Sequence, residues 1–307
     1  MKKWLTLLST FALFGCTTQT VEPAESGEEE GVRTESQATI ESSEPQEPEE
    51  KRISFIGVGD NLIHENVIWA AETPDGSYDF SNMYENIAAD VENADLAFLN
   101  QETIFAGPDY PYSGYPSFNT PEQLGTNMVD LGFDLINGAT NHTLDFGAAG
   151  ATYALDFWKQ YEDVRYTGVF ESEEASREIP TIERDGVTFS FLAYTYGTNG
   201  IEPDTNWRVN YFDEEKIRED VAKAKEVSDV VIVSAHWGDE NTYVVNEYQE
   251  YYGQLFADLE VDVVIGTHPH VIQPIEWLTG TNGNEMLVVW SLGNLLAHAL
   301  DDINTLG

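Results

Sequence analysis

Cysteine is nearly absent from this sequence: Cys16 is the only one in 307 residues. A single cysteine cannot form a disulfide within the chain, and it argues against a structural zinc site built on several thiolates. The fold must therefore be stabilised by buried apolar side chains, and 41% of the residues are hydrophobic.

Positive charge is also scarce, with 14 Lys and Arg against 55 Asp and Glu and a net charge of −41. Residues 1–52 contribute only −6, so −35 belongs to the remainder. Nucleic-acid binding depends on Lys and Arg that neutralise phosphates, so nucleic acid is excluded as a partner. A solvated acidic coat is the plain interpretation, and cation binding by that surface is the alternative.

The N-terminal apolar stretch, residues 4–14, is too short to span a bilayer as a helix. It follows Lys2 and Lys3 and ends in the letters LFGC at 13–16, an arrangement typical of a bacterial lipoprotein signal, although Phe14 is an unusual residue there. We predict a signal peptide over residues 1–16, a lipid on Cys16, and a place on the extracellular face of the cell membrane. An inert cysteine after an ordinary signal peptide is the alternative.

Residues 17–52 are rich in Glu, Ser, Thr, Gln and Pro. Such a composition cannot bury enough apolar surface to fold, so we predict a disordered acidic tether. The domain would then occupy residues 53–307, enough for one large α/β domain.

Strand and helix patterns alternate along this domain. We expect strands at 53–59, 96–99, 133–137, near 166, 187–194, 230–234, 261–265 and 286–290, and helices at 81–92, 121–131, 148–161, 213–227 and 247–259. Residues 105–120 are rich in Gly, Pro and Tyr and should form a long loop. Several strands are almost continuously apolar, which favours a largely parallel sheet covered on both faces.

Side chains of the metal-ligand type follow the ends of these strands, where open α/β sheets place their sites. They are Asp60, Glu102, Asn141, His142, His236, His268 and His270. Carboxylate, amide and imidazole groups suit a divalent ion such as Mn²⁺, Fe²⁺ or Zn²⁺. Seven groups are too many for one four-coordinate ion, and they fit two ions that share a bridging carboxylate.

Each of these residues also has an ordinary explanation. Asp60 could belong to a turn, Asn141 and His142 could cap a helix, and His236 could be a core histidine beside an indole. His268 and His270 could lie on the surface. Their joint occurrence at successive strand ends is what favours a site.

Six segments carry a resemblance to a known family: GDNLIH at 59–64, NQE at 100–102, NHTLD at 141–145, HWG at 236–238, GTHPHVIQ at 266–273 and SLGN at 291–294. In these segments the chain resembles the CapA family of poly-γ-glutamate capsule synthesis, which is similar in fold to calcineurin-like metallophosphoesterases. The resemblance implies a four-layer α/β/β/α sandwich of the metallophosphoesterase type. Family members continue with further strands after SLGN, so we also expect a C-terminally truncated chain that lacks part of one sheet.

The resemblance further implies roles for individual residues. Asp60 and His270 would bind one metal ion, and Glu102 would bridge the two. Asn141, His236 and His268 would hold the second ion. His142 would be a general acid, with a pKa set by the metals and by Asp145. The phosphoesterase pattern opens with Asp-x-His, which is absent here, so either His64 replaces that ligand or the first ion is weakly held.

Two functions are compatible with these features. One is a cell-surface, metal-dependent hydrolase that acts on a phosphoester or on an amide of the capsule polymer. The other is a non-catalytic, metal-containing module that binds or anchors the anionic polymer beside other capsule-synthesis membrane proteins. His142 beside so many ligand-type residues favours the hydrolase. Because the domain is acidic, metals or a few residues such as Arg208 would have to bind the polymer.

Overall fold

The computed structural model describes residues 50–298. The predicted signal peptide, Cys16 and nearly all of the predicted tether lie outside the described residues. Within residues 50–298, no helix has the length and apolar character needed to cross a membrane.

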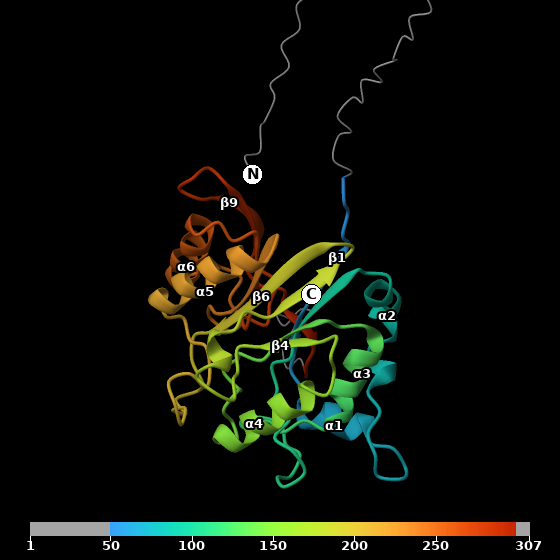
Figure 1. Ribbon diagram of the computed structural model, residues 1–307. Helices are drawn as coiled ribbons and strands as arrows, with labels where there is room; N and C mark the ends of the chain where they lie inside the picture. Colours follow the sequence, from blue (N-terminus) through green and yellow to red (C-terminus); the bar gives the residue numbers. More distant parts are fainter. Residues whose placement is uncertain (1–49, 299–307) are drawn as a thin grey trace, which may run out of the picture. The chain divides into compact units, whose positions relative to one another are not determined.

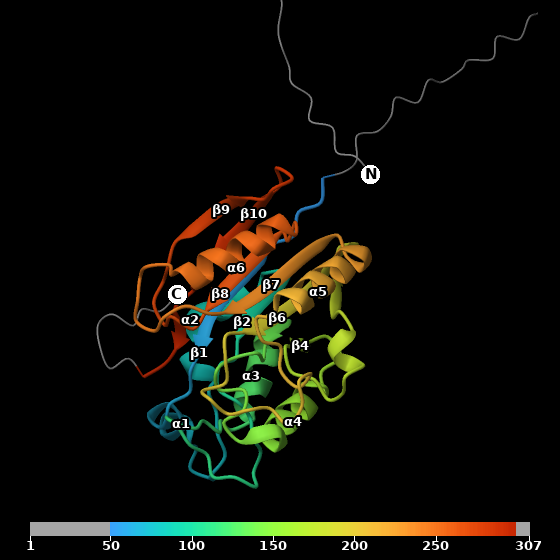
Figure 2. The same cartoon turned by 90° about the vertical axis from the view of Figure 1, so that its left-hand side faces the viewer.

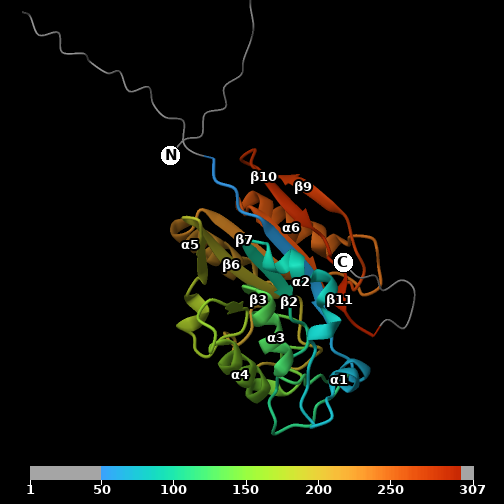
Figure 3. The same cartoon turned by 90° about the vertical axis from the view of Figure 1, so that its right-hand side faces the viewer.

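The first of two sheets has the strand order β11-β1-β2-β3-β4, and all its neighbouring strands are parallel. Its strands are β1 (Phe55–Asn61), β2 (Leu96–Asn100), β3 (Leu135–Asn137), β4 (Arg165–Thr167) and β11 (Asn294–Leu296). Figure 3 shows β11 at the edge of this sheet, beside β1.

The second sheet has the order β5-β6-β7-β8-β10-β9. Its strands are β5 (Thr181–Arg184), β6 (Val187–Thr195), β7 (Val230–His236), β8 (Val263–Thr267), β9 (Ile275–Thr279) and β10 (Glu285–Val289). The four central strands are parallel, and the edge strands β5 and β9 pair antiparallel with their neighbours. Asp185 and Gly186 both have positive φ in the two-residue turn that joins β5 to β6, as the tight hairpin turns with matching twist require.

Helices cover the outer face of each sheet (Figure 1). They are α1 (Glu65–Ala71), α2 (Glu85–Glu92), α3 (Gln123–Leu131) and α4 (Gly147–Trp158) on the first sheet, and α5 (Glu214–Val227) and α6 (Glu247–Asp258) on the second. Figure 2 shows α5 and α6 running alongside β6, β7 and β8.

A separate apolar cluster lies between the two sheets. It includes Leu96 and Phe98 of β2, which face Phe191, Ile232 and Ile265 of the second sheet. Three apolar layers therefore separate four layers of secondary structure, and the predicted α/β/β/α sandwich is confirmed.

The strand pattern alone predicted one largely parallel sheet with both faces covered. This prediction of a single sheet is wrong, because the strands form two sheets. Each sheet has helices on one face and the other sheet on its second face. In β2, Ala97 and Leu99 pack against the helices while Leu96 and Phe98 pack against the second sheet. Both faces are apolar, so the pattern cannot distinguish a cover of helices from a cover of strands.

Most predicted elements are present within a few residues, but α1, β5, β9 and β11 were not predicted. The helix expected over 81–92 is divided at Tyr84 into a 3₁₀ turn (Ser81–Met83) and α2. Tyr84 is buried, and its hydroxyl donates to Oδ1 of Asn61 at 2.6 Å. The hydrogen bond to β1 fixes Tyr84, whose backbone is not helical, at the point where the predicted helix is interrupted.

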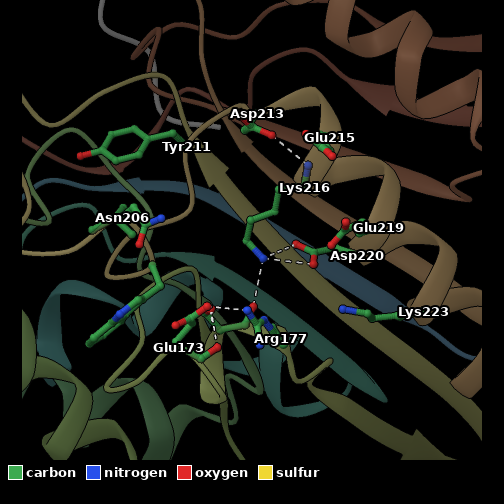
Figure 4. Close-up of a pocket in the computed structure, with 13 residues that line it drawn as sticks. Glu173, Arg177, Asn206, Tyr211, Asp213, Glu215, Lys216, Glu219, Asp220 and Lys223 are labelled. Carbon is green, nitrogen blue, oxygen red and sulfur yellow. Dashed lines mark hydrogen bonds and ion pairs between the residues drawn. The ribbon is translucent and has the colours of Figure 1, made fainter.

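A cavity of about 430 Å³ lies between α5, the loop before it and a 3₁₀ turn at Ala175–Arg177 (Figure 4). Four of its charged side chains form two ion pairs, Glu173 with Arg177 and Lys216 with Asp220. Lys216 donates to the carbonyl oxygen of Ser176 at 3.0 Å and to both carboxylate oxygens of Asp220 at 3.1 and 2.9 Å. Asp220, only 3% exposed, also accepts from the hydroxyl of Tyr194 at 3.0 Å. The network therefore ties α5 to its surroundings.

We expect Lys216→Met to lower the free energy of unfolding by about 1–3 kcal/mol, because Asp220 then loses its counter-charge while it stays buried. The expected loss is smaller than for a fully buried pair, since the Lys216 side chain is 28% exposed. Lys223→Met is the matched control on the same helix and cavity, and we expect it to change stability by less than about 0.5 kcal/mol. Urea unfolding measures both variants, and an equal loss in the two would contradict a role for the network.

Candidate metal centre

The carboxyl ends of the parallel strands in both sheets meet in one region. Asp60 lies near the end of β1, and His236 is the last residue of β7. Glu102 follows β2, Asn141 and His142 follow β3, and His268 and His270 follow β8. Of these seven side chains, five gather into two groups that share Glu102.

The two groups are Asp60–Glu102–His270 and Glu102–His236–His268, all of them buried. In each group, one ligand atom from every residue lies within 4.8 Å of the others. Nε2 of His236 and Nε2 of His270 lie 3.8 and 3.7 Å from Oε1 of Glu102. Both distances are too long for hydrogen bonds. In each pair, however, the nitrogen and the oxygen are close enough for one ion to contact them both, since each metal–ligand bond is about 2.0–2.2 Å.

Glu102 has the strongest signature of an ion-binding group. Its side chain is buried, and neither carboxylate oxygen has a hydrogen-bond partner among the described residues. Nδ1 of His268 is likewise buried without a partner there. Burial raises the pKa of Glu102 well above its usual range, and the nearby His270 opposes the rise. A buried carboxylate without partners is costly, and a bound cation would compensate for that cost. The residues present therefore fit a metal.

The histidines of the two groups differ in their electrostatics. Burial, and next the neighbouring histidines, holds the pKa of His236 and His268 well below the usual range, so both rings are neutral and can offer a lone pair. Burial also lowers the pKa of His270, but the carboxylates of Glu102 and Asp60 outweigh it and raise the pKa to about 10. Nδ1 of His270 donates to Oδ2 of Asp60 at 2.9 Å.

Polar residues at strand ends orient these ligands and were not among the predicted site residues. Nδ2 of Asn100 donates to Oδ1 of Asp60 at 2.6 Å, and Oδ1 of Asn100 accepts from Nδ2 of Asn137 at 2.7 Å. Nδ1 of His236 lies 2.9 Å from Oγ1 of Thr267, which leaves Nε2 toward Glu102. Asn100, Asn137 and Thr267 are the last residues of β2, β3 and β8. A polar residue that closes an apolar strand was the available signal.

The backbone is unusual at two of the predicted ligands. His268 has φ of 96° and His270 has φ of 60°, a region that side chains other than glycine seldom occupy. Such conformations cost of order 1–3 kcal/mol and persist where the surroundings impose them, often at functional sites. In this protein, both residues with positive φ direct their imidazole rings toward Glu102.

Asn141 and His142 point to different partners. Oδ1 of Asn141 lies 3.0 Å from Nε2 of His236, so this amide belongs with the second group. His142 belongs to none of the groups found among the described residues. Its Nδ1 donates to Oδ2 of Asp145 at 2.8 Å, and Asp145 also accepts the backbone N–H of Phe118 at 2.8 Å. Asp145 therefore places the proton on Nδ1 of His142 and leaves Nε2 for chemistry.

The contacts of His64, Glu240 and Arg208 differ from what the sequence alone predicted. Within residues 50–298, no group suited to metal contains His64, which lies beside the N-terminus of α1. Glu240 was not predicted, yet it forms a third, partly exposed group with His268 and His270. The HWG segment just before it was the available signal. Arg208 is buried and paired through two nitrogens with Asp204, so it does not offer a free cation to a polymer.

An α/β/β/α sandwich with buried histidine–carboxylate groups at its strand ends defines a protein suited to metal binding. The family model described as "Bacterial capsule synthesis protein PGA_cap" matches residues 52–299, and the chain belongs to this family. The predicted membership of the CapA family is thereby confirmed.

Two relatives show the same affiliation. The chain is 29% identical over 232 residues to the PGA biosynthesis protein CapA of Bacillus subtilis (strain 168), which covers 69% of this chain and 60% of the relative. It is 26% identical over 175 residues to the capsule biosynthesis protein CapA of Bacillus anthracis, which covers 55% of this chain and 41% of the relative. The chain therefore spans about three fifths or less of the length of these relatives.

Among solved structures, a hypothetical protein from Thermus thermophilus is similar, with 15% identity and a TM-score of 0.47. The alignment covers 78% of this chain and 76% of that protein.

Proposed function

We propose that this chain is a metal-dependent hydrolase that acts at the cell surface in the synthesis or export of a poly-γ-glutamate capsule. The main support for a hydrolase is Glu102. Its buried carboxylate has no hydrogen-bond partner among the described residues, and it is shared by two groups of metal-ligand side chains. The His142–Asp145 pair beside these groups supplies a proton donor. The family and the names of its Bacillus relatives support the capsule pathway.

Asp60, Glu102 and His270 would hold one divalent ion, and Glu102, Asn141, His236 and His268 would hold a second. Mn²⁺, Fe²⁺ and Zn²⁺ suit this donor set, and such ions supply charge stabilisation for the attacking and leaving oxygens of a displacement. We assign the bridging position to Glu102 because it alone belongs to both groups.

His142, with protons on both ring nitrogens, would deliver the proton of Nε2 to the leaving oxygen and keep the proton of Nδ1. Asp145 holds Nδ1–H at 2.8 Å and so fixes the tautomer and the ring direction. Phe118 packs edge-to-face on the His142 ring, with centroids 4.6 Å apart, and limits its rotation. In the hydrolysis of a phosphoester, this proton neutralises the alkoxide that forms as the P–O bond breaks.

Hydrolysis can be tested with aryl phosphate monoesters and diesters and with γ-glutamyl polymer. We expect turnover of at least one of them, loss of that turnover after chelation, and recovery on addition of Mn²⁺ or Zn²⁺. A metal-loaded protein that binds the polymer but hydrolyses none of these compounds would instead support the non-catalytic binding module.

The cell-surface part of the proposal rests on Cys16, where we place a lipid anchor. Cys16→Ser should move the protein from the membrane fraction to the soluble fraction, because a serine cannot carry the thioether-linked lipid. Thr17→Ala, one residue further on, is the matched control and should stay with the membrane. Fractionation of cells that express each variant gives the answer, and a Cys16→Ser protein that remains in the membrane would rule out lipid anchoring at this residue.

A further inference from the structure

All six histidines of the chain lie in one region of the domain. Four of them, at positions 142, 236, 268 and 270, belong to the centre described above. The other two, His64 and His298, line a cavity of about 170 Å³ together with His142 and His270. The metal groups among residues 50–298 include neither His64 nor His298. Two histidines at the mouth of the centre are thus left without a role.

Contacts at Nδ1 orient both of these rings. Nδ1 of His298 accepts from Nδ2 of Asn66 at 2.6 Å, so a neutral His298 ring has its proton on Nε2. The backbone N–H of His298 donates to Nδ1 of His64 at 3.3 Å, and the Leu62 carbonyl oxygen lies 3.2 Å from the same nitrogen. The carbonyl oxygen can only accept and the N–H group can only donate, so these two contacts favour opposite tautomers of a neutral His64 ring. An oxyanion at Nε2 would select the tautomer with Nε2–H. No described residue contacts either Nε2 at hydrogen-bond distance.

Aromatic packing places His64 in relation to the reacting region. The His64 ring meets Phe118 edge-to-face with centroids 5.4 Å apart, and Phe118 also meets the His142 ring edge-to-face with centroids 4.6 Å apart. The His64 and His298 rings are 6.1 Å apart. Phe118 therefore contacts both His64 and the proposed proton donor, and all three line the same cavity as His298.

The charge of the domain makes these imidazoles significant. Residues 53–307 carry a net charge of −35, and no Lys or Arg of the described chain lines this cavity. Glu240, which belongs to the third metal group, is the only acidic residue on the wall within residues 50–298. An anionic substrate would thus find side-chain donors without a permanent charge in this cavity, the imidazole N–H groups among them, and no ammonium or guanidinium group from the described residues.

We propose that His64 and His298 form a subsite for a second oxyanion of the substrate, a carboxylate or phosphate group one spacer away from the bond that is cleaved. This inference rests on the proposed hydrolase and deepens it, because it makes the substrate a molecule with at least two anionic groups. It also makes His64 a substrate-binding residue in place of a metal ligand.

The test uses the full-length, metal-loaded protein and three aryl phosphates that share one scaffold. One carries no second anion, one carries a ring carboxylate, and one carries a ring phosphonate. For His64→Gln and His298→Gln we expect KM to rise about ten- to hundredfold with an anionic ring substituent, the worth of a hydrogen bond to a charged group. The kcat, the metal content and the KM of the unsubstituted compound should stay within about twofold, the range expected where no contact is lost.

The pattern across substrates separates the possible outcomes. A selective rise with only the carboxylate or only the phosphonate identifies the anion that the subsite prefers. An equal rise with all three compounds, or a loss of metal from His64→Gln, overturns the proposal. Tyr115→Phe alters another residue of the same cavity and should change none of these values.

A second readout keeps the subsite distinct from hydrolysis. If the wild-type protein hydrolyses none of the compounds, the proposed hydrolase fails, and equilibrium dialysis with a short γ-glutamyl oligomer then decides about the subsite. Weaker binding by both histidine variants than by Tyr115→Phe supports it. Equal binding by all variants, or no binding by the wild type, contradicts it.

Discussion

Glu102→Gln is expected to remove metal from both groups at once and to abolish turnover with it. Glu102 is the one side chain that belongs to both the Asp60–His270 pair and the His236–His268 pair. Loss of a residue that only orients a ligand lowers metal affinity about 10–100-fold. Loss of a shared ligand should exceed that range, and elemental analysis of the purified variant would show it.

The stability of the metal-free Glu102→Gln variant shows whether metal is lost because a ligand is missing or because the protein misfolds. Both oxygens of Glu102 are buried without hydrogen-bond partners among the described residues, so a neutral amide of the same shape should leave the metal-free protein at least as stable as the wild type. The wild type should gain about 4 kcal/mol when free metal is a thousandfold above its Kd, and Glu102→Gln should gain almost nothing. Thermal unfolding with and without added metal measures both quantities.

Glu240→Gln is the matched control, since Glu240 also lies near His268 and His270 but is exposed and outside the shared position. It should keep most of the metal and most of the thermal gain. If Glu102→Gln kept its full metal content, the bridging role of Glu102 would be refuted.

His142→Ala is expected to slow turnover by about 10²–10⁴-fold while the metal content stays unchanged, because positioned proton transfer typically contributes that much. His142 contacts Asp145 and Phe118 and belongs to none of the metal groups of the described residues. His268→Ala is the contrasting variant. It removes a buried residue of the second group and should deplete metal and activity together.

The leaving group provides a sharper test of the His142 role. A good leaving group such as 4-nitrophenolate needs little protonation, whereas an alkoxide needs it strongly. The loss in His142→Ala should therefore be greater for an alkyl phosphate than for 4-nitrophenyl phosphate. An equal loss with both substrates would show that His142 does not act as the general acid. Asp145→Asn should produce a weaker form of the same pattern, because it leaves the imidazole in place but no longer holds Nδ1–H as a carboxylate does.

Sequence patterns predicted the architecture where a strand or a helix has a strong period of its own. The apolar runs of β2, β7 and β8 and the helical patterns of α3 and α5 all correspond to elements in the structure. The edge strands β5, β9 and β11 were missed because a short edge strand is defined by its partner and hardly by its own residues. The division into two sheets was not readable from the strands, since β2 is apolar on both faces.

At the centre, the sequence identified the side chains of both metal groups because each lies at the end of a strand or within a few residues after it. The sequence marked Asn100, Asn137 and Thr267 only as polar residues that close apolar strands. Their role comes from hydrogen bonds across neighbouring strands: Asn100 bonds to Asp60 and to Asn137, and Thr267 bonds to His236. The sequence also offered no reason to connect His298 with His64, which lie 234 positions apart in the chain. Such long-range contacts are set by the order of strands in the sheet.

The most direct test of this account is the number and position of metal ions bound by the wild-type protein. A crystal of the metal-loaded protein, measured at the absorption edge of Mn or Zn, should show two anomalous peaks on either side of the Glu102 carboxylate. One peak should contact Asp60 and His270, and the other should contact His236 and His268. A crystal grown with excess metal that shows no anomalous peak at Glu102 would contradict the account.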